Sequence, residues 1–535
     1  MIITSVTFDD KTIPLCGANY NATKNIFTIL VGRNGSGKSA LLNRICLITL
    51  SSLLSENGEA ASPQDYLERA EANSNKNNNT GLLSYILKNE QYAINIDTPK
   101  TPQFETVDGL ELSPEAIKTI LTSIQHYFRG RVAFFSDAQW SLHPTPNLNI
   151  IAVSSSPFDK FPIIDSHTSL RYKNVSIAAH YTYRGAKTNT IGSKSYLESK
   201  FDQLGQSFIN FFLNYNSSKD KILPLFNFLG INSKLKLTLR GSLLAHSPEY
   251  TEDGLGELNT TVNSARFFKN KNYHDFEELN ELTKTKITTS AYEVIKANQN
   301  STRSSRDQSQ NTFILDLDIN SNQKPLLLDE LSTLIEYDLL DLENIEFIKS
   351  KDNKPFRLTE ASSGELCILF NVLAIAGAIT DNSVILIDEP ELSLHPEWQT
   401  NFLPLLESIF SKYNGCHFII ATHSPQIISS MEIENSFVVN LENTPPLIIE
   451  GNRVHSHSAD FQLANVFRAP GPRNEYLISQ IINTLTQIRD GKQLDDTFLA
   501  EIDFLIQFND LIPPEDPVKK LLSTLIKAMK VIRHD

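Results

Sequence analysis

Short apolar runs that end in polar residues recur along this chain and predict the strands of a buried sheet. The run at 26–31 passes directly into a glycine-rich segment, and residues 40–50 after it carry the pattern of a buried helix. The runs at 384–387 and 417–422 also end in polar residues, as strands buried on both faces of a parallel sheet do. These patterns predict an α/β fold.

The segment between these runs is patterned differently. Two more apolar runs, at 132–135 and 148–153, predict strands, and the second leads into SSSPFDKFP, where prolines interrupt regular structure. Residues 193–344 follow a mostly helical pattern, broken by an alternating run at 234–240 and a polar loop at 298–312. Apolar heptads are not sustained in this region, which argues against a long coiled-coil arm.

The chain is therefore expected to have a sheet domain that is split by a long insertion. Residues 366–379 form its longest nearly apolar stretch, which is too short to cross a bilayer and predicts a buried helix. The predicted parts are the N-terminal part of the sheet domain at 1–190, an inserted mainly helical lobe at 191–345, the C-terminal part of the sheet domain at 346–445 and a helical C-terminal region at 446–535.

Composition narrows the class of protein. Lys and Arg number 48 against 62 Asp and Glu, and the net charge of -14 excludes a protein that coats nucleic acid along its whole surface. The four cysteines are far apart and form no C-x-x-C pair, which indicates a reducing compartment. The N-terminus alternates like a strand and does not resemble a signal peptide. We expect a globular protein of the cytoplasm that has no contact with a membrane.

The glycine-rich segment carries the most specific chemistry. It fits the pattern G-x-x-x-x-G-K-[ST] between a strand and a helix, with the residues Gly32, Arg33, Asn34, Gly35, Ser36, Gly37, Lys38 and Ser39. In such a loop the backbone N–H groups surround phosphates, Lys38 reaches the β- and γ-phosphates, and Ser39 binds Mg²⁺. ATP and Mg²⁺ are therefore the expected ligands.

Two carboxylates follow the strand at 384–387. Asp388 and Glu389 would lie at the carboxyl edge of the sheet, where α/β proteins bind ligands. Asp388 would hold Mg²⁺, and Glu389 would act as the general base toward the attacking water. The alternative is that both residues only cap the turn at Pro390.

Two weaker signals lie nearby in the sequence. Ser362, Ser363 and Gly364 precede the apolar helix, where backbone N–H groups can bind an anion. The same residues could form an ordinary capping box, with Ser362 as the N-cap and Glu365 three residues on. His423 follows the strand at 417–422, and a lone histidine in such a position is more often structural than catalytic.

In this order, the glycine-rich loop, the ASSGE segment, ILIDEPELSLHP and ATHSP resemble the motifs of the soluble branch of the ABC-type ATPases. The resemblance implies an α/β ABC-type P-loop ATPase head with a long inserted, mainly helical lobe and a helical C-terminal region. In that family two heads enclose two ATP molecules. Ser362 and Gly364 would then contact the γ-phosphate bound by the other head, and His423 would sense it in its own head.

This chain departs from the family pattern at two places. Ala361 stands where the first residue of the ABC signature is usually leucine. The glutamine of the family's Q-loop has two candidate positions, Gln139 and the SSSPFDKF turn. The loop at 392–396 matches the segment that crosses the dimer seam.

The chain's length, its SPFDKF segment and its helical tail are most similar to the PtuA-type ATPases of the Septu and retron antiphage systems. That resemblance implies a homodimer or higher oligomer that hydrolyses ATP and controls a separate HNH-type nuclease. It also allows for a reverse transcriptase and its reverse-transcribed DNA as partners. Two alternatives stay open, namely an ATP-gated nuclease of the overcoming-lysogenization-defect type and a recombination-class DNA-repair ATPase.

Four features bear on these alternatives. The basic and aromatic segment at 266–274 and a cationic strand face at 234–240 could bind nucleic acid or be ordinary surface. The apolar stripe at 518–532 predicts a core or partner-docking helix. A metal site would need C-terminal acids, for which the pattern favours a solvated helical face at Asp495, Asp496, Glu501 and Asp503.

Overall fold

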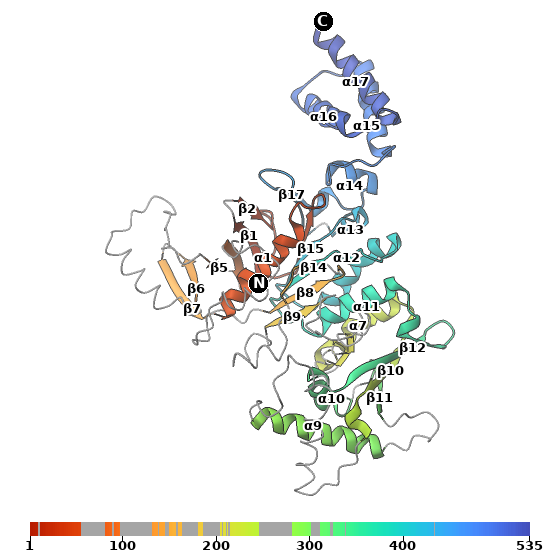
Figure 1. Cartoon of the computed structure of the whole chain (residues 1–535). Coiled ribbons are helices and arrows are strands. Elements are labelled where there is room, and N and C mark those ends of the chain that lie inside the picture. The colour runs from red at the N-terminus through yellow and green to blue at the C-terminus, as the bar shows by residue number, and fades with distance from the viewer. Residues whose placement is uncertain are drawn as a thin grey trace.

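The computed structural model shows a head built around a central sheet, a lobe formed by the inserted segment and a C-terminal group of helices (Figure 1). The structure describes residues 1–8, 11–54, 81–87, 90–96, 131–136, 139–144, 149–156, 159–162, 180–185, 204–205, 207–209, 211, 215–245, 281–300, 311–321, 325–337, 339–432 and 434–534. The basic and aromatic segment at 266–274 lies outside the described residues, so its role stays a prediction.

Within the described residues, the head contains a seven-stranded sheet with the order β17-β16-β3-β15-β14-β8-β9. In that order the strands span Leu447–Glu450, Ser436–Asn440, Ile26–Val31, His417–Ala421, Val384–Asp388, Ile150–Ser154 and Tyr181–Arg184. All neighbours run parallel except the edge strand β17. The central strands are buried along their whole length, which confirms the predicted α/β fold with a parallel sheet.

The two faces of this sheet are covered by different helices. Helices α1, α11, α12 and α13 span Lys38–Leu54, Ser363–Ala376, Pro396–Phe410 and Pro425–Ser429. Leu386 and Ile419 belong to one core cluster with α1, whereas the adjacent Ile387 and Ile420 belong to another cluster with α11, α12 and α13. Because successive strand residues point to opposite faces, α1 and α11 lie on opposite faces of the sheet.

A second, antiparallel sheet packs on the face of the central sheet that carries α1. In the described part of the chain its order is β2-β1-β4-β5-β6-β7. These strands span Lys11–Pro14, Ile2–Phe8, Gly81–Leu87, Glu90–Ile96, Arg131–Ser136 and Gln139–Pro144. The strand predicted at 132–135 is therefore β6, and it belongs to this sheet.

His417 joins the two sheets through a buried set of hydrogen bonds. Its Nδ1 accepts from the backbone N–H of Ile3 at 3.0 Å, and its Nε2 lies 2.8 Å from the hydroxyl of Thr28. Since that hydroxyl donates its proton to the carbonyl of Leu15, Nε2 must donate to the hydroxyl. The imidazole is thus neutral, and burial lowers its pKa to about 3.

The lobe expected to be mainly helical at 191–345 contains an antiparallel sheet as well as helices. Within the described residues the sheet order is β11-β10-β12-β13 (Thr312–Asp318, Ile231–Arg240, Asp341–Lys349 and Pro355–Arg357), and the helices are α7 (Tyr215–Phe228), α9 (Glu281–Asn300) and α10 (Leu328–Glu336). This sheet continues past residue 345. β10 alternates as the sequence predicted. β11 alternates as well, since Leu315 and Leu317 are buried on either side of the exposed Asp316, so its strand pattern was missed. β12 alternates only in part and is a strand through its pairing with β10.

The cationic face predicted at 234–240 is matched by acids on the neighbouring strands. Lys234 lies opposite Asp318, and Lys236 Nζ lies 3.9 Å from a carboxylate oxygen of Glu346. Arg240 also has an acidic partner. The positive charges of this face are therefore paired with acids at the surface, which favours an ordinary solvated strand face over a nucleic-acid-binding surface.

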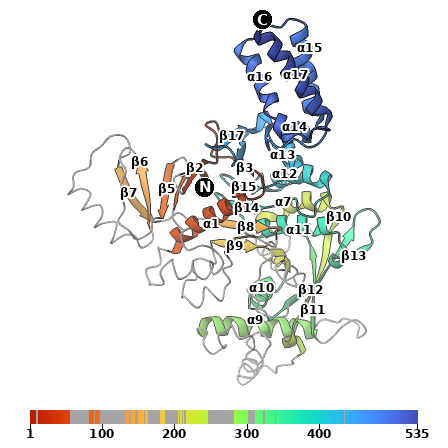
Figure 2. The same cartoon turned by 45° about the horizontal axis from the view of Figure 1, so that its top comes forward.

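The region at 446–535 was expected to be helical, and it begins instead with β17, the edge strand of the central sheet; the described residues after β17 are mainly helical and have their own core. Helices α14, α15, α16 and α17 span Ala459–Asn465, Glu475–Arg489, Asp496–Ile506 and Pro517–His534. Figure 2 shows α15, α16 and α17 side by side, away from the lobe. Val518, Leu522, Leu525 and Met529 are buried in this group, so the predicted stripe is core. No helix in the described part of the chain has both the length and the apolar character that a membrane crossing requires.

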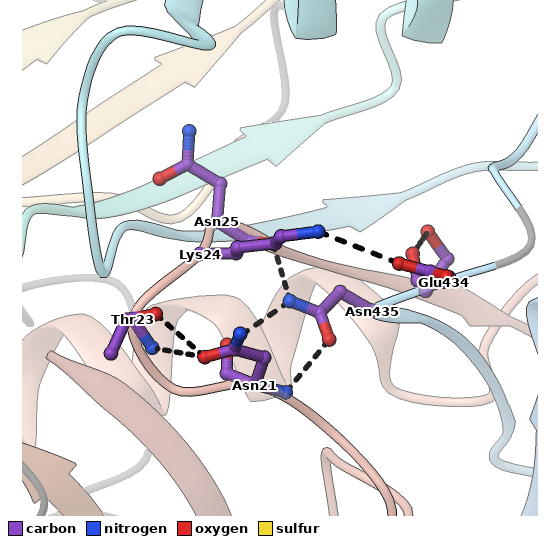
Figure 3. A network of polar contacts seen from close by, with 7 residues as sticks. Asn21, Thr23, Lys24, Asn25, Glu434 and Asn435 are labelled. Carbon is purple, nitrogen blue, oxygen red and sulfur yellow. Dashed lines mark hydrogen bonds and ion pairs between the residues drawn. The ribbon is translucent and has the colours of Figure 1, made fainter.

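A polar network fixes the amino-terminal edge of β3 to the turn before β16 (Figure 3). Asn435 and Asn21 exchange hydrogen bonds, since Asn21 N–H donates to Asn435 Oδ1 at 2.9 Å and Asn435 Nδ2 donates to Asn21 O at 3.0 Å. Asn435 Nδ2 also donates to Asn25 O, and Lys24 pairs with Glu434 at 3.5 Å. The strand that leads into the glycine-rich loop is thereby held at its far end.

The buried neutral His417 predicts a specific loss of stability in acid. Its pKa lies well below that of an unfolded histidine, so its contribution is complete above about pH 6.5 and falls as the pH drops toward 3. Between pH 7 and 5 the wild type should lose about 2 kcal/mol more than His417→Gln. Urea unfolding of both proteins at the two pH values measures this difference. Equal losses would show that His417 is not held neutral.

Candidate functional site

The glycine-rich loop connects β3 to α1 at the carboxyl edge of the central sheet. Gly32, Gly35 and Gly37 have φ angles of 149°, 85° and 94°, a region that L side chains rarely adopt. A Cβ atom on Gly32 would also lie 2.5 Å from Ser36 Oγ. Glycine is therefore required here for the loop to turn tightly before the helix begins at Lys38.

Lys38 is buried against its own loop. Its ammonium donates to the carbonyl oxygens of Gly32 at 2.9 Å and Arg33 at 3.3 Å. Burial lowers the pKa of Lys38, and four nearby carboxylates oppose that shift, the largest opposing effect coming from Glu389. The ammonium thus lies between the loop and a group of negative charges.

Ser39 and Asp388 meet at this edge although they are far apart in sequence. Ser39 Oγ donates to Asp388 Oδ1 at 3.0 Å. Burial raises the pKa of Asp388 to about 7; the Ser39 hydrogen bond opposes this rise, and the carboxylates of Glu389, Asp159 and Glu391 add to it. The Asp388 side chain faces the loop and does not merely cap the turn at Pro390, so a positive charge between these oxygens would be stabilised.

Glu389 and His423 follow β14 and β15 and lie at the same edge of the sheet. Glu389 has a φ of 50°, and its N–H donates to Ala421 O at 2.9 Å, which fixes its backbone next to β15. His423 lies two residues after Ala421. Burial lowers the pKa of His423; Lys38 lowers it further, while Glu389 opposes the shift. Glu389, Lys38 and His423 are therefore electrostatic neighbours.

The turn that follows β8 also lies at this edge. Ser155 N–H donates to Asp388 O at 3.2 Å, and the buried Asp159 accepts a hydrogen bond from Tyr183 Oη at 2.8 Å. Of the two Q-loop candidates, the SSSPFDKF turn is thus next to Asp388. Gln139 begins β7, the edge strand of the other sheet.

Ser362, Ser363 and Gly364 lie at the N-terminus of α11, on the opposite face of the sheet from α1. Ser362 Oγ accepts from Glu365 N–H while Glu365 accepts from Ser362 N–H, which is the capping box that the sequence allowed. Ser362 and Ser363 are exposed. Gly364 is buried, with Ser393 O 3.1 Å from the place of a Cβ. The structure therefore brings the signature to the 392–396 loop of the same chain.

Sequence reasoning missed two acids of this edge. Glu391 accepts the His423 N–H at 2.5 Å. Glu442, which follows β16, accepts the Arg33 N–H and lies 3.5 Å from the Arg33 guanidinium. Both follow strands of the parallel sheet, so asking which polar residues follow every predicted strand would have found them.

The chemistry of these side chains fits ATP and Mg²⁺. Mg²⁺ is commonly held by one or two protein oxygens together with phosphate oxygens and water, and Ser39 and Asp388 present two such oxygens 3.0 Å apart. The loop N–H groups and Lys38 suit phosphates.

A nuclease-type metal site, built from several acidic or histidine side chains, is a separate question. In the parts of the chain that the structure describes, no group of three or more His, Cys, Asp or Glu side chains could hold a metal ion. The acids predicted to be a solvated face, Asp495, Asp496, Glu501 and Asp503, are exposed.

Comparison with protein families supports an ATPase domain. Residues 182–429 match the model of a family described as "AAA domain, putative AbiEii toxin, Type IV TA system". The matched range is somewhat less than half of the chain. It includes the signature, Asp388 and His423, and it begins after the glycine-rich loop.

Segments of this chain are also similar to three known proteins. Over 106 residues it is 35% identical to the retron Ec83 probable ATPase of Escherichia coli, covering 18% of this chain and 19% of that protein. Over 80 residues it is 36% identical to protein ea59 of Escherichia phage lambda, covering 15% of each. Over 57 residues it is 37% identical to the retron Vc95 probable ATPase of Vibrio cholerae serotype O1 biovar El Tor, covering 11% and 10%. The chain thus spans less than a fifth of the length of each relative. These similarities support an ATPase.

Among solved structures, the chain is similar to the Smc head domain with an extended coiled coil, bound to the C-terminal domain of ScpA, from Pyrococcus furiosus. The identity is 12%, with 84% of this chain and 96% of that chain covered, and the TM-score is 0.28. A score this low carries no weight, so the fold rests on the strand order and the site geometry.

The tight turn at Gly32 predicts that the loop does not tolerate a side chain. Gly32→Ala should lower affinity for ATP at least about tenfold, because a misplaced loop loses its contacts with phosphates. Gly230→Ala is a matched control, since Gly230 has a φ of 64° in the lobe and open space around it. Fluorescent ATP-analogue binding to both variants measures the effect, and equal affinities would contradict it.

Proposed function

We propose that this chain binds and hydrolyses ATP at the edge formed by the glycine-rich loop, Asp388 and His423. The observation that carries the proposal is the contact between Ser39 and Asp388, which brings the loop against the strand with the acidic pair. Lys38 and Glu389 lie at the same edge as electrostatic neighbours. This combination of groups suits phosphoryl transfer to water, a reaction that depends on positioning and on charge stabilisation.

Each residue has a distinct role in this proposal. The loop N–H groups and Lys38 bind the phosphates, and Ser39 and Asp388 would hold Mg²⁺, which neutralises phosphate charge when bound. Glu389 accepts the proton of the attacking water. His423, which burial and Lys38 keep neutral, can donate a hydrogen bond to the γ-phosphate.

The signature completes the site from a second copy of the chain in this proposal. Ser362 and Ser363 are exposed at the N-terminus of a 14-residue helix, so their hydroxyl groups can donate to an anion there, while the N–H of Ser362 is already bonded to Glu365. Their helix lies on the opposite face of the sheet from α1. Leu392 in the adjacent loop is 38% exposed, which suits a seam between two copies. A homodimer, or a higher oligomer built from it, would therefore enclose ATP between heads.

The biological role that we propose is antiphage defence. Two of the three similar proteins are named as retron probable ATPases, and the matched family is described by a toxin of a toxin–antitoxin system. By that similarity and the PtuA-type resemblance, the chain would act in the cytoplasm and control an HNH-type nuclease. A reverse transcriptase and its reverse-transcribed DNA would be further partners.

Two substitutions test the hydrolytic site directly. Lys38→Ala should abolish ATP binding, and Glu389→Gln should retain binding while lowering hydrolysis at least about 100-fold, because only the base is lost. Phosphate release and retention of radiolabelled ATP after gel filtration measure the two effects. Hydrolysis that survives in either purified variant would contradict the assignment of this site.

Mixing two inactive variants tests whether the site is shared. Lys38→Ala destroys the loop of one copy and Ser362→Arg blocks its signature, so neither variant alone should hydrolyse ATP. In a mixture, heterodimers contain one intact loop facing one intact signature, and hydrolysis should reappear. If the mixture stays inactive although heterodimers are recovered by sequential purification on two different affinity tags, one on each variant, the signature does not act across the dimer.

A further inference from the structure

The segments that follow β14 and β15 are joined by two hydrogen bonds. Glu389 N–H donates to Ala421 O at 2.9 Å, and His423 N–H donates to Glu391 Oε1 at 2.5 Å. The first bond continues the parallel pairing of the two strands. The second uses a side chain, so it depends on the residue at position 391.

Glu391 is placed as an acceptor for the residues around His423. One carboxylate oxygen, Oε1, accepts the His423 N–H. The other oxygen, Oε2, is buried and has no hydrogen-bond partner among the described residues. A buried oxygen without a hydrogen-bond partner costs free energy of folding. The hydrogen bond from the His423 N–H to Oε1 is the contact that holds this side chain in its buried position.

The other side of His423 is fixed independently. Ser424 Oγ accepts from Ile427 N–H at 3.2 Å and caps α13, and it donates to Gln399 Oε1 on α12 at 2.6 Å. The backbone after His423 is therefore anchored to two helices. The contact with Glu391 supplies the anchor at His423 itself, on the side of Glu389.

We propose that Glu391 is a positioning residue that holds His423 in register with Glu389 by accepting the His423 N–H. This inference rests on the proposed ATP hydrolysis, in which Glu389 acts on water and His423 on the γ-phosphate. Both groups must meet one phosphoryl group, and errors of about 1 Å between such groups can lower a rate about 100-fold. Glu391 provides the link because it lies two residues after Glu389 and touches His423 directly.

A different role for Glu391 would be to supply negative charge near Lys38, whose pKa it helps to raise. The two roles predict opposite behaviour for Glu391→Gln. Glutamine keeps the carbonyl oxygen that accepts the His423 N–H and removes the charge. Alanine removes both.

Steady-state hydrolysis by Glu391→Ala and Glu391→Gln separates these roles. Alanine should lower kcat about 10- to 100-fold and leave the KM for ATP within about threefold, since it disturbs the chemical step more than binding. Glutamine should restore kcat to within about threefold of the wild type. The control is Glu397→Ala, an exposed residue in the first turn of α12, which should behave as the wild type.

Equal loss of kcat in the alanine and glutamine variants would overturn the proposal, because charge and not the hydrogen bond would then matter. A rise in KM alone would overturn it as well. Hydrogen exchange of the 421–424 segment gives a readout without turnover: it should be faster in Glu391→Ala and close to wild type in Glu391→Gln. A wild type without Lys38-dependent hydrolysis would refute the proposed function, and unchanged exchange in the alanine variant would refute the contact itself.

Discussion

The site depends on the parallel register of β3, β15, β14 and β8. In-register pairing aligns Asp388 with Ala421 on one side and with Ser154 on the other, so the strands end level with one another. Residues that follow strands far apart in sequence then meet at a single edge. The hydrogen bond from Ser39 to Asp388 is the direct result. Without this register, the loop lysine, the acidic pair and the histidine would have no common substrate.

The same sheet separates the motifs that it does not bring together. Successive strand residues face opposite sides, so α1 packs in one core cluster and α11 in the other. The glycine-rich loop begins α1 and the signature begins α11. In the proposed function these two segments are halves of one nucleotide site on different surfaces, which is why a second copy would be needed to close it.

Local sequence was sufficient for the central strands β3, β8, β14 and β15 and for the site residues Lys38, Ser39, Asp388 and Glu389. The loop at 32–39 and the pair Asp388 and Glu389 carry patterns that specify both structure and chemistry within a few residues. The lobe was harder to predict: the short alternation in β11 lies between segments of helical pattern, and β12 alternates only in part and depends on its pairing with β10. Glu391 and Glu442 follow strands but carry no motif of their own, and the groups they contact, the His423 N–H and Arg33, belong to segments distant in sequence.

The structure of the protein with a non-hydrolysable ATP analogue and Mg²⁺ tests the central claim most directly. The account predicts phosphates surrounded by the loop at 32–39, Lys38 on the terminal phosphate, and Ser39 and Asp388 at the metal. It also predicts Ser362 of a second copy on the same phosphate. Nucleotide bound away from this edge, or a site filled by one chain with its signature exposed, would contradict the account.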